Sequence, residues 1–343
     1  MNNPLEQKFL SVLEKDRSKF ISKWMIAWDY QEIRKKRGLK YNDELPEDFF
    51  SYGGKEDLVK WMNWFHFDFP DYFPSSLTED LIKASLENDK RILSKLNLTY
   101  DFQNYNKRVG INNAHDFLFP NFYPVPERNK IKNIIDFGAG YGRQANLFTS
   151  KISECIYTAV DAIPNSYCLQ NLYFSHLDKP FYEYIDSQDN FKIENNRKGI
   201  YHLPTWRKDL LPDNFYDLVM CVQVLPELNS TLVRSMLKEF HRALKPGGML
   251  YIRDHASTWK PAGKINVDEF LSENGFILEF KPHIINEKDL HGIPRIWRKI
   301  DSEVVKSQTM SFDRKLKQTI EDIDTLSGGL LRKVVKKVKS PKG

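Results

Sequence analysis

A turn with three glycines is the part of this chain best suited to hold a ligand. The mainly apolar run at 134–137 leads directly into Gly138, Gly140 and Gly142. Glycine permits sharp turns and a close approach of the backbone to a ligand, and the helix predicted to follow would offer its first N–H groups. The dinucleotide pattern G-x-G-x-x-G would need a glycine at position 143, where this chain has Arg143. The spacing G-x-G-x-G therefore does not fit a dinucleotide.

An acid lies at the distance that a nucleoside would require. A second strand is predicted at 157–161, and it ends in Asp161, 19 residues after Gly142. A carboxylate there can bind both hydroxyls of a ribose. The other residues that we assign to this ligand are Asp136, Asp209 and Gln223.

The elements that must position these residues alternate between strands and helices. We predict strands at 134–137, 157–161, 200–203, 217–225 and 249–253, and helices after 143 and at 231–244. The segment 217–225 is a continuous apolar run, as expected for a central strand of a parallel sheet. A helix at 267–271 and strands at 277–280 and 293–300 follow, the last one antiparallel. The alternation predicts an α/β fold.

Four of these features, in this order, resemble class I S-adenosylmethionine (SAM)-dependent methyltransferases. They are the glycine motif, Asp161, the run Asp217-Leu-Val-Met, and Lys245-Pro-Gly-Gly248, and the resemblance covers about residues 130–301. It implies a Rossmann-like sheet of seven strands with helices on both faces, and SAM as the cofactor. It also implies that Asp209 meets the adenine amino group, for which a helix or loop cap is the competing interpretation.

The cofactor class determines which catalytic groups are needed. Methyl transfer from a sulfonium is an in-line displacement, so a hydroxyl acceptor needs a base, whereas an amine must only be unprotonated. In open α/β sheets such groups are expected at the carboxyl ends of the strands. The candidates there are Glu227 and the pair Asp254 and His255, and His115 is a further candidate before the first strand. A structural role is the main competing interpretation for His255.

The first 129 residues are predicted to be mainly helical, with helices at 5–36 and 76–96. Between them lies an aromatic-rich stretch at 61–69, which fits a small helical core. Part of this region is expected to cap the acceptor pocket, and the segment 105–116 is expected to be a polar loop near the cofactor. We predict three parts: a helical cap at 1–129, a SAM-binding domain at 130–301, and a basic extension at 302–343. A polar insertion at 178–198 is expected to be a surface loop or hairpin.

The net charge of +5 comes from one end of the chain. From Leu326 onward there are six basic residues and no acids, and without them the chain has 45 basic and 46 acidic residues. Leucines and valines between 330 and 338 fall on one helical face and the basic residues on the other. This pattern predicts a basic amphipathic helix that lies on anionic membranes, or alternatively a frayed end or a helix packed on the body.

Composition limits the compartment and the partners. The three cysteines are scattered, with no C-x-x-C pair and no metal-like cluster with histidine, so a reducing cytoplasm and no metal are expected. The first residues contain no apolar core of a signal peptide, and no apolar stretch approaches the length of a membrane span. A near-neutral body does not favour nucleic acid as a partner. We therefore expect a cytoplasmic protein whose basic C-terminal helix can contact the inner face of the membrane.

Two classes of methyl acceptor are disfavoured because the sequence lacks their motifs. Base amino methyltransferases carry an Asn/Asp-Pro-Pro-aromatic sequence after the fourth strand, whereas this chain has Leu225-Pro-Glu-Leu228. The paired glutamates of protein arginine methyltransferases are not evident either. The layout, with a helical segment before Asp-Phe-Gly-Ala-Gly-Tyr-Gly-Arg, is similar to sugar O-methyltransferases of bacterial surface-polysaccharide pathways, although no sugar-specific residue is matched. We predict O-methylation of a sugar, glycan or other small polar metabolite. A small-molecule N-methyltransferase and a catalytically silent SAM-binding module are the alternatives.

Overall fold

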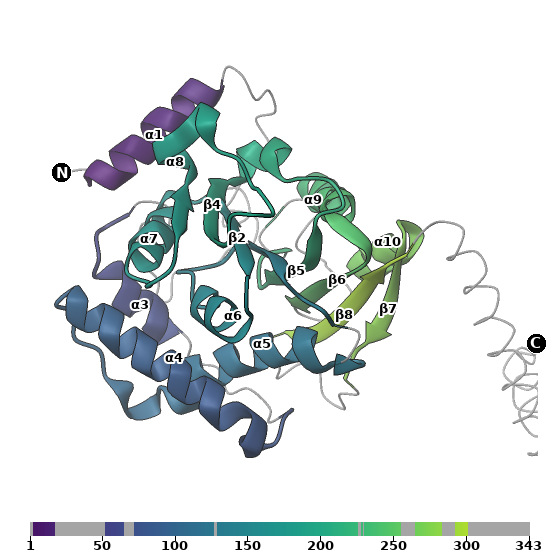
Figure 1. Ribbon diagram of the computed structural model, residues 1–343, viewed down its shortest axis with the longest axis horizontal. Coiled ribbons are helices and arrows are strands. Elements are labelled where there is room, and N and C mark those ends of the chain that lie inside the picture. The colour runs from purple at the N-terminus through teal and green to yellow at the C-terminus, as the bar shows by residue number, and fades with distance from the viewer. Residues whose placement is uncertain are drawn as a thin grey trace, which may run out of the picture. The chain divides into compact units, whose positions relative to one another are not determined.

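The protein is built around one mixed sheet, seen in the computed structural model in Figure 1. The structure describes residues 3–17, 52–64, 72–126, 129–225, 228, 230–254, 265–282 and 292–300. The sequence predictions for 18–36, for the part of the aromatic stretch at 65–69 and for the basic extension 302–343 lie outside these residues. No helix in the described ranges is long and apolar enough to cross a membrane.

Eight strands form the sheet, in the order β3-β4-β2-β1-β5-β6-β8-β7. Their bounds are β1 (Asn133–Phe137), β2 (Ile156–Asp161), β3 (Phe181–Glu183), β4 (Gly199–Pro204), β5 (Tyr216–Val222), β6 (Leu244–Asp254), β7 (Phe276–Phe280) and β8 (Ile293–Lys299). The first six strands in this order, β3-β4-β2-β1-β5-β6, pair in parallel. Strand β8 runs antiparallel to both of its neighbours, β6 and β7. The predicted Rossmann-like α/β fold with its antiparallel last strand is thus confirmed.

Helices cover both faces of the sheet. They are α1 (Pro4–Arg17), α3 (Asp57–Trp64), α4 (Ser75–Lys95), α5 (Ile111–Phe122), α6 (Ala145–Lys151), α7 (Pro164–Ser175), α8 (Tyr184–Ser187), α9 (Ser230–Ala243) and α10 (Val267–Glu273). One apolar cluster joins the sheet to α1, α8, α9 and α10, and another joins it to α3, α4, α5 and α6, while α7 contributes to both. Every residue of β1 and β2 is buried, which explains why these strands appear in the sequence as mainly apolar runs.

The structure differs from the sequence predictions at two places. An eighth strand, β3, arises from the insertion expected to be a loop or hairpin, and it pairs in parallel with β4 at the edge of the sheet. The expected polar loop at 105–116 is helical, because a π-helical turn over Asn106–Gly110 runs directly into α5. Most polar side chains of α5 are buried rather than solvated, and two of them, Asn113 and Asp116, contact Arg143 at the end of the glycine turn.

A buried carboxylate links the N-terminal helices to the sheet region. Asp89 of α4 accepts hydrogen bonds from the hydroxyls of Tyr105 and Tyr173, each at 2.6 Å. Tyr173 belongs to α7, so this contact ties the N-terminal helices to a helix that packs on the sheet. Burial raises the pKa of Asp89 to about 6, although the two tyrosine hydroxyls act in the opposite direction.

Candidate functional site

A cavity opens at the carboxyl ends of β1, β2 and β5, where the strand order reverses on either side of β1. Ligands bind at such switch points in open α/β sheets. Its walls come from the ends of these strands, from the glycine turn, and from residues of α3 and α5. The N-terminal region thus contributes to the same cavity as the sheet.

The three glycines have different roles in the turn. All have positive φ, at 70° for Gly138, 61° for Gly140 and 89° for Gly142. A Cβ on Gly138 would lie 2.3 Å from the Val224 side chain, and one on Gly142 would lie 2.4 Å from the ring of Phe174. A Cβ on Gly140 would meet only Trp61, at 3.7 Å, and would project into the cavity. Gly138 and Gly140 line the cavity, whereas Gly142 is required for packing against α7.

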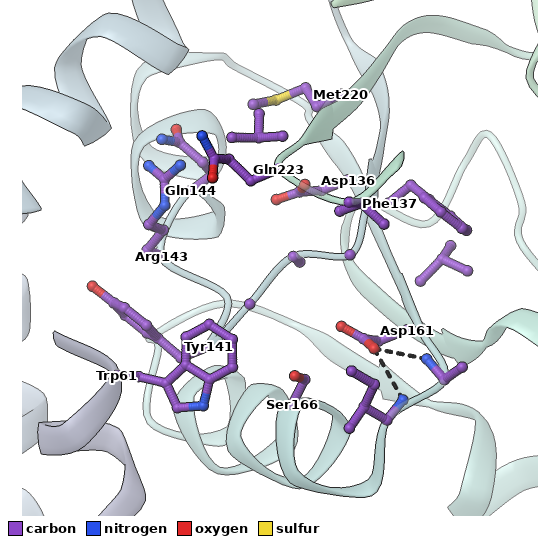
Figure 2. A pocket seen from close by; sticks show the side chains of 18 of the residues that line it. Trp61, Asp136, Phe137, Tyr141, Arg143, Gln144, Asp161, Ser166, Met220 and Gln223 are labelled. Carbon is purple, nitrogen blue, oxygen red and sulfur yellow. Dashed lines mark hydrogen bonds between the residues drawn. The ribbon is translucent and has the colours of Figure 1, made fainter. Parts of the chain in front are cut away.

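Asp161 ends β2 at the opposite side of the cavity from Arg143 and Gln144 (Figure 2). One carboxylate oxygen accepts the backbone N–H groups of Ala162 at 2.7 Å and Ile163 at 3.1 Å. The other accepts the Gln170 side-chain amide at 2.8 Å. Burial raises the pKa of Asp161, while these donors hold the carboxyl in a fixed orientation.

Asp136 lies between these two sides of the cavity, on β1. Its carboxylate accepts the hydroxyl of Tyr157 from the neighbouring strand. Burial raises the pKa of Asp136 to about 6, partly opposed by that hydrogen bond and by the charge of Arg143. The hydrogen bond from Tyr157 therefore fixes the orientation of the Asp136 carboxylate.

A buried cluster of charges forms the side of the cavity next to α5. Asp116 is fully buried and accepts two hydrogen bonds from Arg253, at 2.7 and 2.8 Å, and one from the Tyr251 hydroxyl at 2.8 Å. Arg143 pairs with the same carboxylate and donates to Asn113 at 2.8 Å. Burial alone would raise the pKa of Asp116, but the two guanidinium groups lower it to about 2. Arg143 and Arg253 both line the cavity, so α5 holds two cationic side chains at its wall.

Two tryptophans of α3 form the wall over the glycine turn. Trp61 and Trp64 both line the cavity, and their rings meet edge to face with centroids 5.6 Å apart. The Trp61 indole N–H donates to Asn165 of α7 at 3.0 Å. Figure 2 shows Trp61 on the side of the glycine turn away from Gln223. These two residues of the N-terminal region line the cavity, and the predicted role of this region as a cap over the acceptor stays a prediction.

Comparison with known proteins gives the family. The family described as "Methyltransferase domain" matches residues 106–307, which is more than half of the chain. The chain belongs to this methyltransferase family. None of the curated proteins matches it.

Solved structures with a similar fold include several methyltransferases. A SAM-dependent methyltransferase from Methanosarcina mazei is 14% identical, with 52% of this chain and 98% of that chain covered and a TM-score of 0.36. The N-methyltransferase NodS from Bradyrhizobium japonicum, in complex with S-adenosyl-L-homocysteine, is 12% identical, with 64% and 99% covered and a TM-score of 0.40. The StiE O-MT is 12% identical, with 61% and 82% covered and a TM-score of 0.42.

The family match makes this protein a methyltransferase, and its cavity fits SAM as the cofactor. Gly140 leaves room beside the backbone where a side chain would protrude, and Asp161 presents a fixed, buried carboxylate at the end of β2. SAM supplies an electrophilic methyl group on a sulfonium. The chain's own residues must orient that group, exclude water, and place the acceptor in line behind it.

The methyltransferase brings most of the predicted cofactor residues together. Those that line the cavity are Asp136, Gly138, Gly140, Asp161 and Gln223. Gln223 directly follows β5 and has a positive φ of 61°, which is uncommon for a residue other than glycine. Asp209 is not brought to the cavity, because its carboxylate lies 3.0 Å from the Arg207 guanidinium, and Thr205 lines the cavity instead.

Of the four predicted catalytic residues, the two that the structure describes do not line the cavity. His115 is fully buried in an aromatic group with Tyr72, Phe73 and Phe119, and it does not line the cavity. Asp254 is buried at the end of β6 and does not line the cavity either, because alternation along the strand turns Arg253 to that side. His255 and Glu227 lie outside the described residues.

Several cavity residues were not predicted as site residues. They include Asn112, Arg143, Gln144 and Arg253, with Trp61 and Trp64 expected only as part of a cap. The position of Arg143 directly after the glycine motif was a usable signal, since that residue must lie at the start of the ligand-facing helix. Nothing local marked Arg253, whose role depends on Asp116, 137 residues earlier. Within the described ranges no group of three or more His, Cys, Asp or Glu side chains is placed to hold a metal ion.

Proposed function

We propose that this methyltransferase transfers the methyl group to an oxygen of a sugar, glycan or other small polar metabolite. The observation that carries the proposal is the group of polar side chains at one end of the cavity, formed by Arg143, Gln144 and Gln223 (Figure 2). Amide and guanidinium groups offer several hydrogen bonds in a small space, which suits an acceptor with many hydroxyls. Asn112 and Arg253 extend the same side of the cavity.

The cofactor is proposed to lie between this polar end and Asp161. Asp161 would accept the two ribose hydroxyls, and the backbone at Gly138 and Gly140 would run along the amino-acid part, with Asp136 and Gln223 beside it. Asp161→Ala removes charge-assisted hydrogen bonds of about 1.5–3 kcal/mol each, so S-adenosylhomocysteine should bind at least tenfold more weakly by calorimetry. Unchanged affinity would rule out this placement.

The base for a hydroxyl acceptor is proposed to be His255, with Glu227 as the second candidate. Both follow strands that end at the cavity, β6 and β5. His255→Ala should lower kcat by roughly 10²–10⁴-fold while S-adenosylhomocysteine binding is unchanged. The matched control is His176→Ala, which removes a histidine from the carboxyl end of α7. Normal turnover of the His255 variant would exclude His255 as the base. Glu227 would then be the base, or the enzyme would accelerate the reaction by positioning the substrates alone.

Methyl-labelled SAM distinguishes the acceptor atom. The enzyme is incubated with SAM carrying a ¹³C-methyl group and with separate panels of sugars, nucleotide sugars, other hydroxylated metabolites and amines. Because methyl carbons on oxygen and on nitrogen resonate at different ¹³C shifts, the product spectrum identifies the bond that forms. An O-methyl product supports the proposal. Transfer to amines alone would replace it with a small-molecule N-methyltransferase.

A peripheral membrane contact is proposed for the basic segment at 330–342. It rests on the sequence pattern, in which leucines and valines alternate with six basic residues at helical spacing. Each Lys or Arg near an anionic bilayer contributes on the order of 1 kcal/mol, and the attraction weakens with salt. Full-length protein should sediment with phosphatidylserine vesicles and a chain truncated at Leu326 should not. Equal sedimentation would exclude the contact.

A further inference from the structure

A buried chain of hydrogen bonds connects Asp161 to a histidine on the neighbouring strand. Gln170 of α7 donates its side-chain amide to the Asp161 carboxylate at 2.8 Å and to the Gly140 carbonyl at 2.9 Å. Its amide oxygen lies 3.1 Å from Nε2 of His202 in β4. Nδ1 of His202 lies 2.7 Å from the Glu183 carboxylate. Gln170 and His202 are both fully buried, so no solvent competes for these bonds.

The orientation of the Gln170 amide follows from its neighbours. An Asp161 carboxylate oxygen and the Gly140 carbonyl can only accept hydrogen bonds, so the group that faces both must be the amide NH₂. The amide oxygen of Gln170 then faces His202, and it can only accept as well. The opposite orientation would place an oxygen against two oxygens, which the buried setting would penalise strongly.

The same argument determines the protonation of both ring nitrogens of His202. Nε2 must carry a hydrogen to donate to the Gln170 oxygen, and Nδ1 must carry one to donate to the Glu183 carboxylate. Glu183 also accepts from Tyr167, from Asn171 at 2.7 Å and from the backbone of Ile185 at 3.1 Å, as expected for an ionised carboxylate. Burial alone would raise the pKa of Glu183, but the charge and hydrogen bond of His202 lower it below its usual range.

The surroundings of His202 are consistent with a cation. The ring of Tyr167, from α7, stacks on the imidazole with centroids 3.8 Å apart, and the ring of Phe174, from the same helix, meets it edge on. Phe181 of β3 lies on a further side. The charged or titratable groups that face the imidazole are Glu183 from β3, Tyr167 from α7 and Asp161 from β2.

We infer that His202 is an imidazolium in the folded enzyme and that, through Gln170, it positions Asp161 and the Gly140 turn for the cofactor. This inference rests on the proposed role of Asp161 in cofactor binding. His202 and Gln170 do not line the cavity, so they act through Asp161 and Gly140 as positioning residues. If His202 loses the Nε2 proton, its lone pair faces the Gln170 oxygen, and the amide no longer holds Asp161 and Gly140 together.

The protonation state can be measured directly. ¹⁵N-histidine is incorporated into the full chain, and ring correlation spectra are recorded between pH 6 and 9 with and without S-adenosylhomocysteine. The His202→Gln variant identifies the signal by its loss. We expect His202 to show the pattern of two protonated nitrogens at pH 7. A neutral tautomer at pH 7 would overturn the inference, whatever the binding data show.

Binding of S-adenosylhomocysteine tests the positioning role. Gln170→Met keeps the length of the side chain and removes the hydrogen bonds to Asp161 and Gly140, so affinity should fall roughly tenfold. Gln170→Glu should bind weakly at neutral pH, because two carboxylates then face each other, and should regain affinity in acid as the new carboxyl becomes protonated. The control Asn171→Leu removes an amide from Glu183 but leaves Gln170 in place, and its affinity should stay within about twofold.

The outcomes separate this inference from the proposed role of Asp161. If Asp161→Ala weakens binding but Gln170→Met does not, the positioning role fails and the role of Asp161 stands. If Asp161→Ala has no effect, the role of Asp161 itself fails. Should Gln170→Met fail to fold, the acid recovery of Gln170→Glu decides, since a purely structural defect would not be repaired by protonation.

Discussion

Arg143 and Asp116 form an ion pair in the interior of the protein, and this pair joins the end of the glycine turn to helix α5. Asp116 also receives two hydrogen bonds from Arg253 on β6. One carboxylate of α5 therefore connects the end of the glycine turn and strand β6 to the N-terminal region. The cavity wall on that side depends on a single buried acid.

Asp116→Asn should destabilise the fold strongly. Removing one partner of a buried charge network leaves the guanidinium groups without compensation, which costs about 3–5 kcal/mol. Urea unfolding at neutral pH would measure the loss. The control Asp213→Asn breaks an exposed ion pair with Arg242, and its effect should stay below about 1 kcal/mol. Comparable effects of the two changes would show that the buried network contributes little.

The stability that Asp116 contributes should decrease in acid. The pKa of Asp116 is lowered from 3.8 to about 2, so its contribution to stability is present above pH 4 and is lost as the pH falls through about 2. The free energy of unfolding of the wild type should therefore exceed that of Asp116→Asn at pH 5, and the gap should narrow between pH 4 and 2. A gap that stays constant over this range would mean that Asp116 is not ionised in the folded state.

Asp89 should have the opposite pH dependence. Its pKa is raised to about 6, so the stability it contributes is fully present below pH 4 and is lost as the pH rises through 6. Relative to Asp89→Asn, the wild type should become less stable by about 2–3 kcal/mol between pH 4 and 7. Urea unfolding at several pH values would test this. An unchanged difference would show that the hydroxyls of Tyr105 and Tyr173 keep Asp89 ionised throughout.

Substitutions in the glycine turn should separate binding from stability. Gly142→Ala places a methyl group against the Phe174 ring, so it should lower stability by about 2–4 kcal/mol through overpacking and the positive φ. Gly140→Val also suffers from a positive φ, but its side chain enters the cavity. S-adenosylhomocysteine affinity should fall most for Gly140→Val, and the melting temperature most for Gly142→Ala. The reverse order would contradict the separate roles of these glycines.

The sequence predicts the sheet well because its strands are short apolar runs between clear turns. It also selects Gly140 and Asp161, which line the cavity, since both follow directly from the spacing after a buried strand. Helix α5 was not recognised, because its polar residues suggested a solvated loop, although they pair with Arg143 and Arg253 in the interior. The choice between Arg253 and Asp254 depends on which face of β6 each occupies, and a strand buried on both faces carries no alternation to reveal this.

Trp61 should contribute to cofactor binding through its ring more than through its hydrogen bond. The ring lines the cavity next to Gly140, and the indole N–H donates to Asn165, whose amide in turn donates to Asp57 at 2.9 Å. Trp61→Phe keeps an aromatic wall and should weaken S-adenosylhomocysteine binding by about threefold or less, whereas Trp61→Ala should weaken it roughly tenfold. The comparison is made by calorimetry, with thermal melting to confirm that both variants fold. If Trp61→Phe is as weak as Trp61→Ala, the contact with Asn165 is the decisive one, and the wall acts by holding α3 against α7.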